Sequence, residues 1–480
     1  MRALWTHEQA AAATGGSNRT AWSATGVSID SRTVAIGDLF VAIVGPNADG
    51  HRYVADALSR GAAAAVVVRE ALPHLNLPRT APLLIVADTL VALEDLARAA
   101  RARSRAKIVG ITGSVGKTST KEALGRALAR LGPTTVAEGN LNNHWGLPLS
   151  LARLPADAAY GVFELGMNHA GEIAALTAIL QPHVAVVTTV AAAHAAHFAS
   201  EEAIADAKGE IFLGVVEGGA AVINRDNRHF TRLAAHAAGA GVGRILGFGA
   251  HDAADIRLLD CTLHAACSAV RARIGQTVLD YSIGAPGRHI VLNSLAVLGA
   301  VHALDGNVAE AARAMGEVRP LPGRGLRRVV EIAAGSFLVI DESYNANPTS
   351  MRAAIAVLGN VDRHEGGRRI AVIGDMLELG PGSAALHADL APDLEQAGID
   401  LVFTAGPDSG RLFEAMPPER RGSHAADSAT LAPLVAAAVR PGDTVMIKGS
   451  AGSRMGRVLD ALLALADERR DAPPKRANGG

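Results

Sequence analysis

Short apolar runs alternate with helix-like patterns in the first part of the chain. The runs Leu39–Val44 and Ala62–Val68 have the length of buried strands. The apolar spacing over Val54–Ser59 and Leu90–Arg101 is typical of helices that pack against such strands. We therefore expect a small α/β domain over residues 1–102.

From Lys107 onward the pattern becomes strand, glycine-rich loop and helix. Strands separated by helices form right-handed βαβ units, which build a mostly parallel sheet. The predicted elements of this central domain are strands at Ile108–Ile111, Gly161–Glu164, Val184–Val190 and Ala220–Ile223, and a helix at Lys117–Leu131.

A break rich in proline and glycine at Arg319–Gly325 predicts a second domain boundary. Beyond it, apolar runs end in polar or glycine loops and are followed by helical patterns, as in a doubly wound sheet. These runs are Phe337–Ile340, Ile370–Ile373, Leu401–Thr404 and Val445–Ile447. The sequence thus predicts an α/β fold with domains at 1–102, 103–320 and 321–466. The charged residues 467–480 are expected to form a tail without regular structure.

Composition and charge narrow the possible functions. Of the 480 residues 49% are hydrophobic, and 46 basic against 47 acidic side chains leave a net charge of −1, which offers no broad basic surface for nucleic acid. The two cysteines, Cys261 and Cys267, make no disulfide framework and lack zinc-site spacing. Polar residues interrupt the most apolar stretch, Val184–Ala199, and from the residues at the N-terminus we expect no secretory signal. We expect a cytoplasmic protein without stable membrane insertion.

The strongest local motif is Gly110-Ile-Thr-Gly113-Ser-Val-Gly116-Lys117-Thr118, between a predicted strand and a predicted helix. Glycines let main-chain N–H groups close around phosphate oxygens, and the helix N-terminus adds positive potential. The lysine can reach the β- and γ-phosphates, and the threonine hydroxyl can bind Mg²⁺. Ile111 stands where the strict Walker pattern has glycine. The motif predicts a nucleoside triphosphate site formed by Gly113, Ser114, Val115, Gly116, Lys117, Thr118 and Ser119.

Three further side chains are expected near this motif. Glu164 ends one predicted strand and His194 follows the next, so the two could share a cation. Lys208 lies in a helical stretch near the same edge, where partial burial would make its amine reactive. From residue type alone, a solvated glutamate, a loop histidine and a surface lysine remain the alternatives.

The chain resembles the Mur ligase family, the ATP-dependent amide-bond ligases of peptidoglycan precursor synthesis, over most of its length. The family's motifs occur in order through all three predicted domains. Up to the second boundary they are Asp30-Ser31-Arg32, Gly37-Asp-Leu-Phe40, Asp49-Gly50-His51, the P-loop, Gly139-Asn-Leu-Asn-Asn143, Glu164-Leu-Gly-Met167, Ala193-His194, Lys208-Gly-Glu-Ile-Phe212 and Pro286-Gly-Arg-His289. The later ones are Pro322-Gly-Arg324, Asp341-Glu-Ser-Tyr-Asn345-Ala-Asn347-Pro, Gly374-Asp-Met-Leu-Glu378 and Lys448-Gly-Ser450.

The resemblance implies a task for each domain. The first would hold a UDP-linked substrate, the second ATP, and the Rossmann-like third would contribute to ATP and dipeptide binding. The motifs favour the branch that joins D-alanyl-D-alanine to UDP-muramoyl-tripeptide through an acyl phosphate, using ATP and two Mg²⁺ ions. The expected enzyme is a monomer.

The resemblance also implies residue roles. Catalysis would involve Lys117, His194 and Lys208, the last corresponding to a lysine that is carbamylated in relatives. Thr118, Glu164 and His194 would bind metal. The residues implied at the nucleotide are Asn293, Arg324, Asp341, Asn345 and Asn347, and those implied at the substrate are Ser31, Arg32, Asn140, Asn142 and Asn143.

Three positions depart from the family pattern. The glutamate that often follows His194 is missing from Ala193-His194-Ala-Ala-His197-Phe198, Ile290 stands where relatives commonly have asparagine, and Glu342 stands where aspartate is frequent. Alternatives that keep the chemistry are the tripeptide-forming ligase and a folylpolyglutamate synthase-like protein. A P-loop ATPase uncoupled from ligation and a non-catalytic nucleotide-sugar binder are alternatives of another class.

Overall fold

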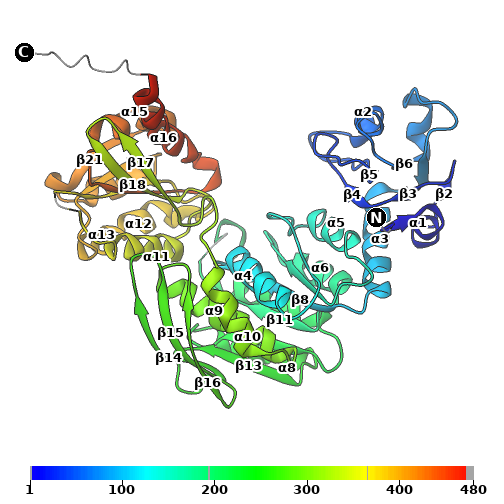
Figure 1. Cartoon of the computed structure of the whole chain (residues 1–480), viewed down its shortest axis with the longest axis horizontal. Helices are drawn as coiled ribbons and strands as arrows, with labels where there is room; N and C mark the ends of the chain where they lie inside the picture. The colour runs from blue at the N-terminus through cyan, green and yellow to red at the C-terminus, as the bar shows by residue number, and fades with distance from the viewer. Residues whose placement is uncertain (1–2, 193–194, 365, 472–480) are drawn as a thin grey trace, which may run out of the picture.

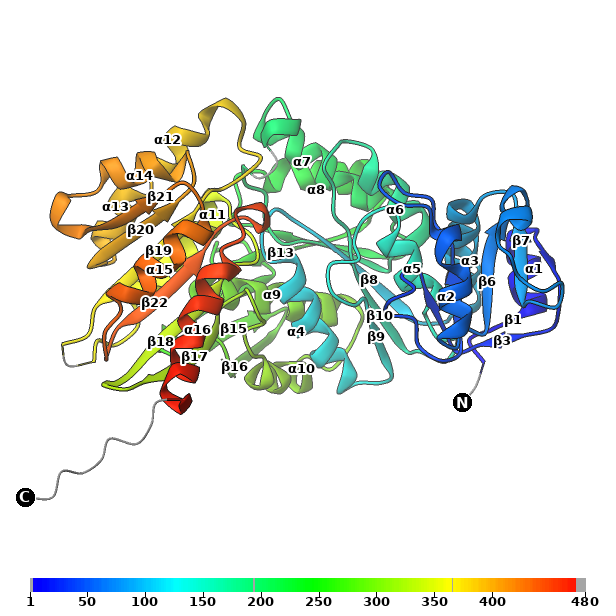
Figure 2. The same cartoon turned by 90° about the horizontal axis from the view of Figure 1, so that it is seen from above.

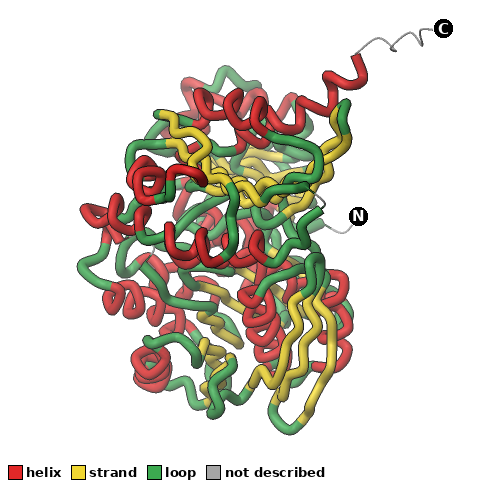
Figure 3. Tube along the Cα trace, turned by 90° about the vertical axis from the view of Figure 1, so that its left-hand side faces the viewer, coloured by secondary structure: helices red, strands yellow, loops and turns green. Residues whose placement is uncertain are grey.

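The computed structural model describes residues 3–192, 195–364 and 366–471. Three α/β units follow one another along the chain, with the N-terminal and C-terminal units at opposite ends and the middle unit between them (Figure 1). Figure 2 shows the same row from above. Each unit contains one main sheet, of five, nine and six strands in chain order. Figure 3 shows the strands (yellow) among the helices (red).

The N-terminal unit has a five-stranded sheet in the order β2 (Ser17–Asn18), β7 (Leu83–Val86), β6 (Ala64–Val68), β5 (Asp38–Val41) and β4 (Gly26–Ser28). Only β2 runs antiparallel to its neighbour. Leu39 and Phe40 face opposite sides of the sheet and belong to different cores, as the alternation of a strand requires. The remaining elements are β1 (Trp5–Thr6), β3 (Ser23–Ala24), α1 (His7–Thr14), α2 (Val54–Ser59) and α3 (Thr89–Arg103).

The middle unit has a nine-stranded sheet. Its strands, in spatial order, are β16 (Thr277–Ile283), β15 (Ser268–Ile274), β14 (Ile256–Leu263), β13 (Arg244–Gly249), β12 (Ala220–Asn224), β11 (Val184–Val187), β8 (Lys107–Thr112), β10 (Tyr160–Glu164) and β9 (Thr134–Val136). The strands from β9 to β14 are parallel, whereas β14, β15 and β16 pair antiparallel. Its helices are α4 (Lys117–Ala129), α5 (Gly146–Ala152), α6 (Glu172–Leu180), α7 (Glu201–Gly209), α8 (Phe230–Gly239), α9 (Arg288–Ala303) and α10 (Val308–Ala314).

Strand β8 positions the P-loop at the centre of this sheet. Its residues Val109 and Ile111 pack into the core under α4 and α9, and Ile108 packs into the core on the other face. The strand lies between β10 and β11. Because parallel strands end at the same edge, the loops after these three strands lie close together.

The C-terminal unit has a six-stranded sheet. Its strands, in spatial order, are β17 (Leu326–Ile332), β18 (Gly335–Glu342), β22 (Thr444–Lys448), β19 (Arg369–Gly374), β20 (Leu401–Ala405) and β21 (Arg421–Ala425), of which only β17 is antiparallel. The helices are α11 (Pro348–Gly359), α12 (Ser383–Ala388), α13 (Ala391–Gln396), α14 (Ser409–Ala415), α15 (Ser428–Ala438) and α16 (Gly456–Asp471). Helix α16 therefore continues past residue 466, where the last domain was expected to end.

The predicted α/β class is confirmed, including the parallel strands β8, β10, β11 and β12. Strand β11 ends at Val187 rather than at the predicted Val190. The reason is that Thr188 turns toward the P-loop, where its hydroxyl donates to the carbonyl of Val115 at 2.6 Å. The antiparallel strands β14 to β16 were not predicted. None of the helices within the described residues combines the length and apolar character needed to cross a bilayer.

The N-terminal and middle units share a packed interface. Helix α3 packs against α5, and the indole N–H of the buried Trp5 donates to the carbonyl of Ala152 at 2.9 Å. The guanidinium of Arg153 donates to the carbonyl of Val27 at 2.7 Å. These bonds fix the end of α5 in the middle unit against the N-terminal unit.

Candidate active site

The loop between β8 and α4 depends on two glycines with left-handed backbone angles. Gly113 has φ +150° and Gly116 has φ +89°. A Cβ atom on Gly113 would lie 1.9 Å from Oγ1 of Thr188, and one on Gly116 would lie 2.8 Å from the Asn293 amide. The loop can therefore approach its neighbours closely only with glycine at both positions.

At the start of α4, Lys117 and Thr118 make the contacts expected of a phosphate and metal site. The Nζ of Lys117 donates to the carbonyl of Gly113 at 2.7 Å, so the side chain lies over the loop. The hydroxyl of Thr118 donates to Oε2 of Glu164 at 2.8 Å. The other oxygen of that carboxylate, Oε1, accepts from the Asn142 amide at 2.7 Å. The adjacent hydroxyl and carboxylate oxygens are the type of ligand that Mg²⁺ prefers.

One cleft brings these residues together with residues of the C-terminal unit, and we call it the nucleotide cleft. Its wall in the middle unit includes the P-loop, the segment after β9, the end of β10 and part of α7 and α9. The predicted residues that line it are Ser114, Val115, Gly116, Lys117, Thr118, Ser119, Asn140, Asn142, Glu164, Lys208, Asn293, Arg324, Asn345 and Asn347.

Lys208 is buried in this cleft at 2% exposure. Within the described part of the chain its amine has no hydrogen-bond or ion-pair partner. Burial, with a smaller contribution from the charge of Lys117, holds the pKa of this amine well below its ordinary value. Burial also lowers the pKa of Lys117, although the negative charge of Glu164 acts in the opposite direction. The surface-lysine alternative for Lys208 is therefore excluded by its position.

The C-terminal unit contributes a second set of charges to the cleft. Lys448, at the end of β22, is buried; its Nζ donates to the carbonyl of Asn345 at 3.0 Å and to Oε2 of Glu342 at 3.3 Å. His289, at the start of α9, also lines the cleft. Burial lowers the pKa of His289, the charge of Glu342 opposes this effect, and Lys448 reinforces it. The sequence motifs contained Lys448 and His289, but no role was assigned to either residue.

Asp341 fixes the segment that joins the two units. Its Oδ2 accepts from the N–H of Gly323 at 2.7 Å, and its Oδ1 accepts from the Ser343 hydroxyl at 2.6 Å. Arg324 follows Gly323 directly and stacks over the ring of Tyr344, with 4.1 Å between Cζ and the ring centroid. The structure thus places Asp341 behind the cleft wall, where it orients Arg324.

A mostly apolar pocket adjoins the nucleotide cleft, and its walls come from α4, α9 and the chain before Arg324. Ile290, Asn293 and Arg324 line both spaces. The side chains that line only the pocket are mainly apolar and include Ile283, Pro286, Met315, Val318 and Leu321. Its position beside the P-loop and its mostly apolar lining, to which Ile290 contributes, suit a nucleobase.

A separate cleft lies at the N-terminal unit. Ser31 and Arg32 line it, and Arg32 is held by a bidentate contact with Asp30, 2.6 Å at its shorter bond. The middle unit completes the cleft with Glu138, Leu141 and Trp145. The chain from 138 to 145 therefore borders both clefts, because Asn140 and Asn142 from the same segment line the nucleotide cleft. Asn143 instead accepts from the N–H of Gly146 at 2.9 Å at the start of α5.

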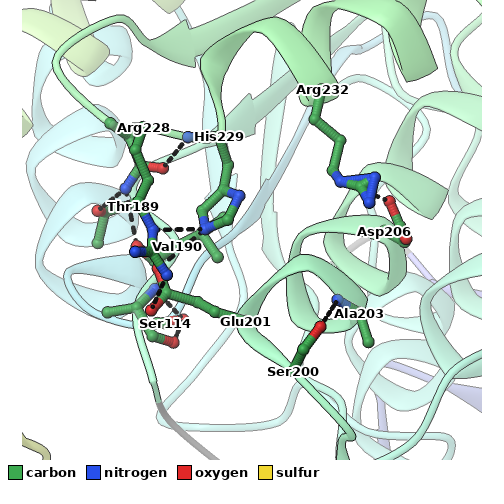
Figure 4. Close-up of polar contacts among 12 residues, drawn as sticks. Ser114, Thr189, Val190, Ser200, Glu201, Ala203, Asp206, Arg228, His229 and Arg232 are labelled. Atoms are coloured by element: carbon green, nitrogen blue, oxygen red, sulfur yellow. Dashed lines mark hydrogen bonds and ion pairs between the residues drawn. The ribbon is translucent and has the colours of Figure 1, made fainter.

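Polar contacts at the ends of β11 and β12 hold the other side of the P-loop (Figure 4). The Ser114 hydroxyl donates to the carbonyl of Ala191 at 3.0 Å, and the amide of Asn227 donates to the carbonyl of Val190 at 2.7 Å. At the start of α7, Glu201 pairs with His229 at 2.9 Å. These contacts position the beginning of the helix that carries Lys208. His194 lies outside the described residues.

Sequence comparisons identify the arrangement. Three profiles match the chain: "Mur ligase family, catalytic domain" at residues 23–101, "Mur ligase middle domain" at 111–301 and "Mur ligase, glutamate ligase domain" at 327–451. The chain is 34% identical over 438 residues to the UDP-N-acetylmuramoyl-tripeptide–D-alanyl-D-alanine ligase of Escherichia coli (strain K12), covering 91% of this chain and 93% of that relative. The chain belongs to the Mur ligase family.

Other Mur ligases support this assignment. The ligase of the same name from Rickettsia prowazekii is 32% identical over 434 residues, which is 90% of this chain and 94% of the relative. A crystal structure of MurF from Acinetobacter baumannii superposes with a TM-score of 0.83 at 30% identity, covering 96% of this chain and 98% of that chain. MurF ligase from Thermotoga maritima in complex with ADP gives 0.76 at 28% identity, covering 92% and 98%.

We predict that Gly116→Ala impairs ATP binding by this Mur ligase. A left-handed conformation costs a residue with a Cβ about 1–2 kcal/mol, and here the new atom also meets Asn293. The KM for ATP should rise about tenfold while the fold is retained. Gly171→Ala is a matched control, because Gly171 has φ +87° but open space around it. Isothermal calorimetry measures the affinity of both variants for ATP. Equal affinities would contradict the role of the contact between Gly116 and Asn293.

Proposed function

We propose that this Mur ligase joins D-alanyl-D-alanine to UDP-N-acetylmuramoyl-tripeptide, with conversion of ATP to ADP and phosphate. The observation that carries the proposal is the convergence of Lys117, Lys208 and Arg324 on one cleft between two units. The names of the Escherichia coli and Rickettsia prowazekii relatives support the choice of substrates. The product would be a UDP-linked pentapeptide for peptidoglycan precursor synthesis.

The chemistry requires activation of a carboxylate, because a carboxylate is a poor electrophile. An oxygen of the tripeptide's terminal carboxylate would attack the γ-phosphorus of ATP, forming a new P–O bond as the bond to ADP breaks. The amine of the dipeptide would then attack the carbonyl carbon of this acyl phosphate. The resulting tetrahedral intermediate would expel phosphate, and the amine would lose a proton to give the amide.

The residues of the cleft suit the first step, because phosphoryl transfer depends on charge neutralisation and alignment more than on covalent catalysis. Lys117 would hold the γ-phosphate, and Arg324 would add positive charge from the C-terminal unit. The backbone N–H groups of the glycine loop would hold the other phosphates. Acyl phosphates hydrolyse readily, so the C-terminal wall of the cleft would also serve to exclude water.

Thr118 and Glu164 fit a magnesium site beside the P-loop. Their oxygens lie 2.8 Å apart, and the set is oxygen-only, as Mg²⁺ prefers. Bound Mg²⁺ would neutralise phosphate charge, and we propose two ions, the second also near Glu164 and His194. In the described ranges no cluster of three His, Cys, Asp or Glu side chains is arranged around a metal position.

Lys208 is suited to become a carbamate. A buried amine with a lowered pKa is uncharged at a lower pH than an exposed lysine, and only the uncharged amine adds CO2. Addition forms an N–C bond and releases a proton, which leaves a carboxylate-like group. This change would place a negative charge beside Lys117 where the free lysine has only an unpaired amine.

The setting of the reaction is also part of the proposal. We expect it in the cytoplasm, because ATP is the phosphoryl donor and both cysteines are free thiols. Small molecules are the expected partners, with no nucleic acid and no membrane insertion, and the expected unit is a monomer. A domain closure about the junctions near residues 103 and 320 would bring the acceptor to the ATP.

Other activities remain distinguishable by product and coupling. We predict that ADP release with UDP-N-acetylmuramoyl-tripeptide is at least about tenfold faster when D-alanyl-D-alanine is present, because the acyl phosphate needs an amine to turn over. A coupled ADP assay and mass spectrometry of the product measure this directly. A tripeptide-forming or folate-type ligase would give no pentapeptide product. Full-speed ADP release without the dipeptide would indicate an uncoupled ATPase.

We predict that Lys208→Ala lowers kcat about 10²–10³-fold, the usual effect of losing a buried charged group at a reacting centre. Formate or acetate should restore part of the activity, because either can supply a carboxylate in the vacated space. Lys117→Ala is the control: it removes a cation from the same cleft, so acids should not rescue it. Failure of every short acid to rescue Lys208→Ala would count against the carbamate.

A further inference from the structure

Lys121 is a charged side chain with no exposed surface. It lies on α4 three residues after Thr118, and it is 0% exposed. Residues three apart lie on neighbouring positions of one helix face, so Lys121 points in roughly the same direction as Thr118. It does not line the nucleotide cleft. Burying an ammonium is unfavourable unless hydrogen bonds replace its water, so its partners show what the side chain holds.

Those partners belong mainly to the chain that leaves β9. The ammonium of Lys121 donates to the carbonyl of Ala137 and to that of Gly139, the latter at 2.9 Å. Its third contact is with the adjacent Glu122, at 3.1 Å. Gly139 has φ +53°, and a Cβ there would meet nothing within 4 Å, so this glycine serves the turn rather than a close approach. Lys121 therefore fixes the backbone just before Asn140.

A second connection joins the same helix to the same segment. Thr118 donates to Glu164 at 2.8 Å, and Glu164 accepts from Asn142 at 2.7 Å. The main chain of Asn142 is also fixed, because its carbonyl accepts from the N–H of Gly166 at 2.8 Å. With the two carbonyl contacts of Lys121, these bonds form one hydrogen-bond network that joins α4 to residues 137–142.

This network is important for function because the segment that it fixes, residues 137–142, borders both clefts. Asn140 and Asn142 line the nucleotide cleft, while Glu138 and Leu141 line the N-terminal cleft. An acceptor that is anchored at its UDP end and reacts at its peptide end must pass along this segment. Its carboxylate then reaches the γ-phosphate only if the segment keeps a fixed distance from the P-loop helix.

We propose that Lys121 is a positioning residue that sets the acceptor-binding segment 137–142 relative to the P-loop. The proposal rests on the proposed function, since it assumes that the UDP-linked peptide is the acceptor. Lys121 lines neither of the two clefts. It acts by holding two main-chain carbonyls, so Asn140 and Asn142 present their amides at a constant distance from Lys117.

The test compares Lys121→Met with Lys107→Met. Lys107 also donates to a main-chain carbonyl, that of Leu304 at 2.7 Å, but it lies at the opposite end of β8. Calorimetry gives the affinities for UDP-N-acetylmuramoyl-tripeptide and for a non-hydrolysable ATP analogue, and steady-state assays give kcat and both KM values. Thermal unfolding reports whether each variant folds.

Lys121→Met should weaken UDP-peptide binding and lower kcat about 10- to 100-fold, because small misplacements of a substrate-positioning group have effects of this size. The affinity for the ATP analogue should stay within about twofold of the wild-type value. Lys107→Met should leave the affinities for both ligands unchanged. Lys121→Arg should recover part of the loss, since a guanidinium can donate to both carbonyls. When Lys121→Met is combined with Asn142→Ala, the loss of UDP-peptide affinity and kcat should be smaller than the product of the two single losses, because both residues belong to one hydrogen-bond network.

If Lys121→Met lowers the affinities for the UDP-linked tripeptide and the ATP analogue equally, or changes neither affinity, the positioning role is overturned. If Lys121→Met does not fold, Lys121→Arg decides by the same criterion: a selective rise in the acceptor KM supports the proposal, and an equal or absent change opposes it. If the wild-type protein itself fails to bind UDP-N-acetylmuramoyl-tripeptide, the proposed function fails, and with it the positioning role. Normal wild-type binding with an unselective variant removes the positioning role alone.

Discussion

The dominant physical constraint in this protein is electrostatic: an anionic carboxylate must approach an anionic triphosphate away from water. Water would screen the repulsion between the two anions, but it would also hydrolyse the acyl phosphate. The site must therefore reduce this repulsion and at the same time exclude water. The structure meets both requirements with cations that line one cleft. Lys117 comes from the middle unit, and Arg324 and Lys448 come from the segment and sheet that follow. Lys448 is buried, and Lys117 and Arg324 are partly buried, so each charge acts more strongly than it would at a surface.

The parallel sheets explain how residues so distant in sequence reach one cleft. The P-loop follows β8, Glu164 ends β10, and Lys448 ends β22. In each sheet the carboxyl ends of parallel strands share an edge, and these two edges face the same cleft. Asp341 links them through its bond to Gly323, so Arg324 is held at the boundary between the units.

Much of this could be predicted from the sequence. The strand–loop–helix pattern predicted a nucleotide site with Lys117 and Thr118 and placed Glu164 at the same edge of the sheet, while the metal role of Glu164 came from the family resemblance. Lys448 follows the apolar run Val445–Ile447 and could have been found by the same rule. Strands β14 to β16 are not part of the predicted βαβ pattern, although Ser268–Ile274 alternates buried and more exposed residues with the period of two that is typical of a strand. The contacts of Asp341 and Asn143 depend on main-chain partners that side-chain type does not reveal.

Transfer of oxygen from the acceptor carboxylate to phosphate is the most direct measure of the central claim. UDP-N-acetylmuramoyl-tripeptide labelled with ¹⁸O in its terminal carboxylate would be turned over with ATP and D-alanyl-D-alanine, and the released phosphate analysed by mass spectrometry. Activation through an acyl phosphate predicts one labelled oxygen in each phosphate derived from the fully labelled acid. Unlabelled phosphate accompanying normal amide formation would contradict it, because the carboxylate would then never have been joined to phosphorus.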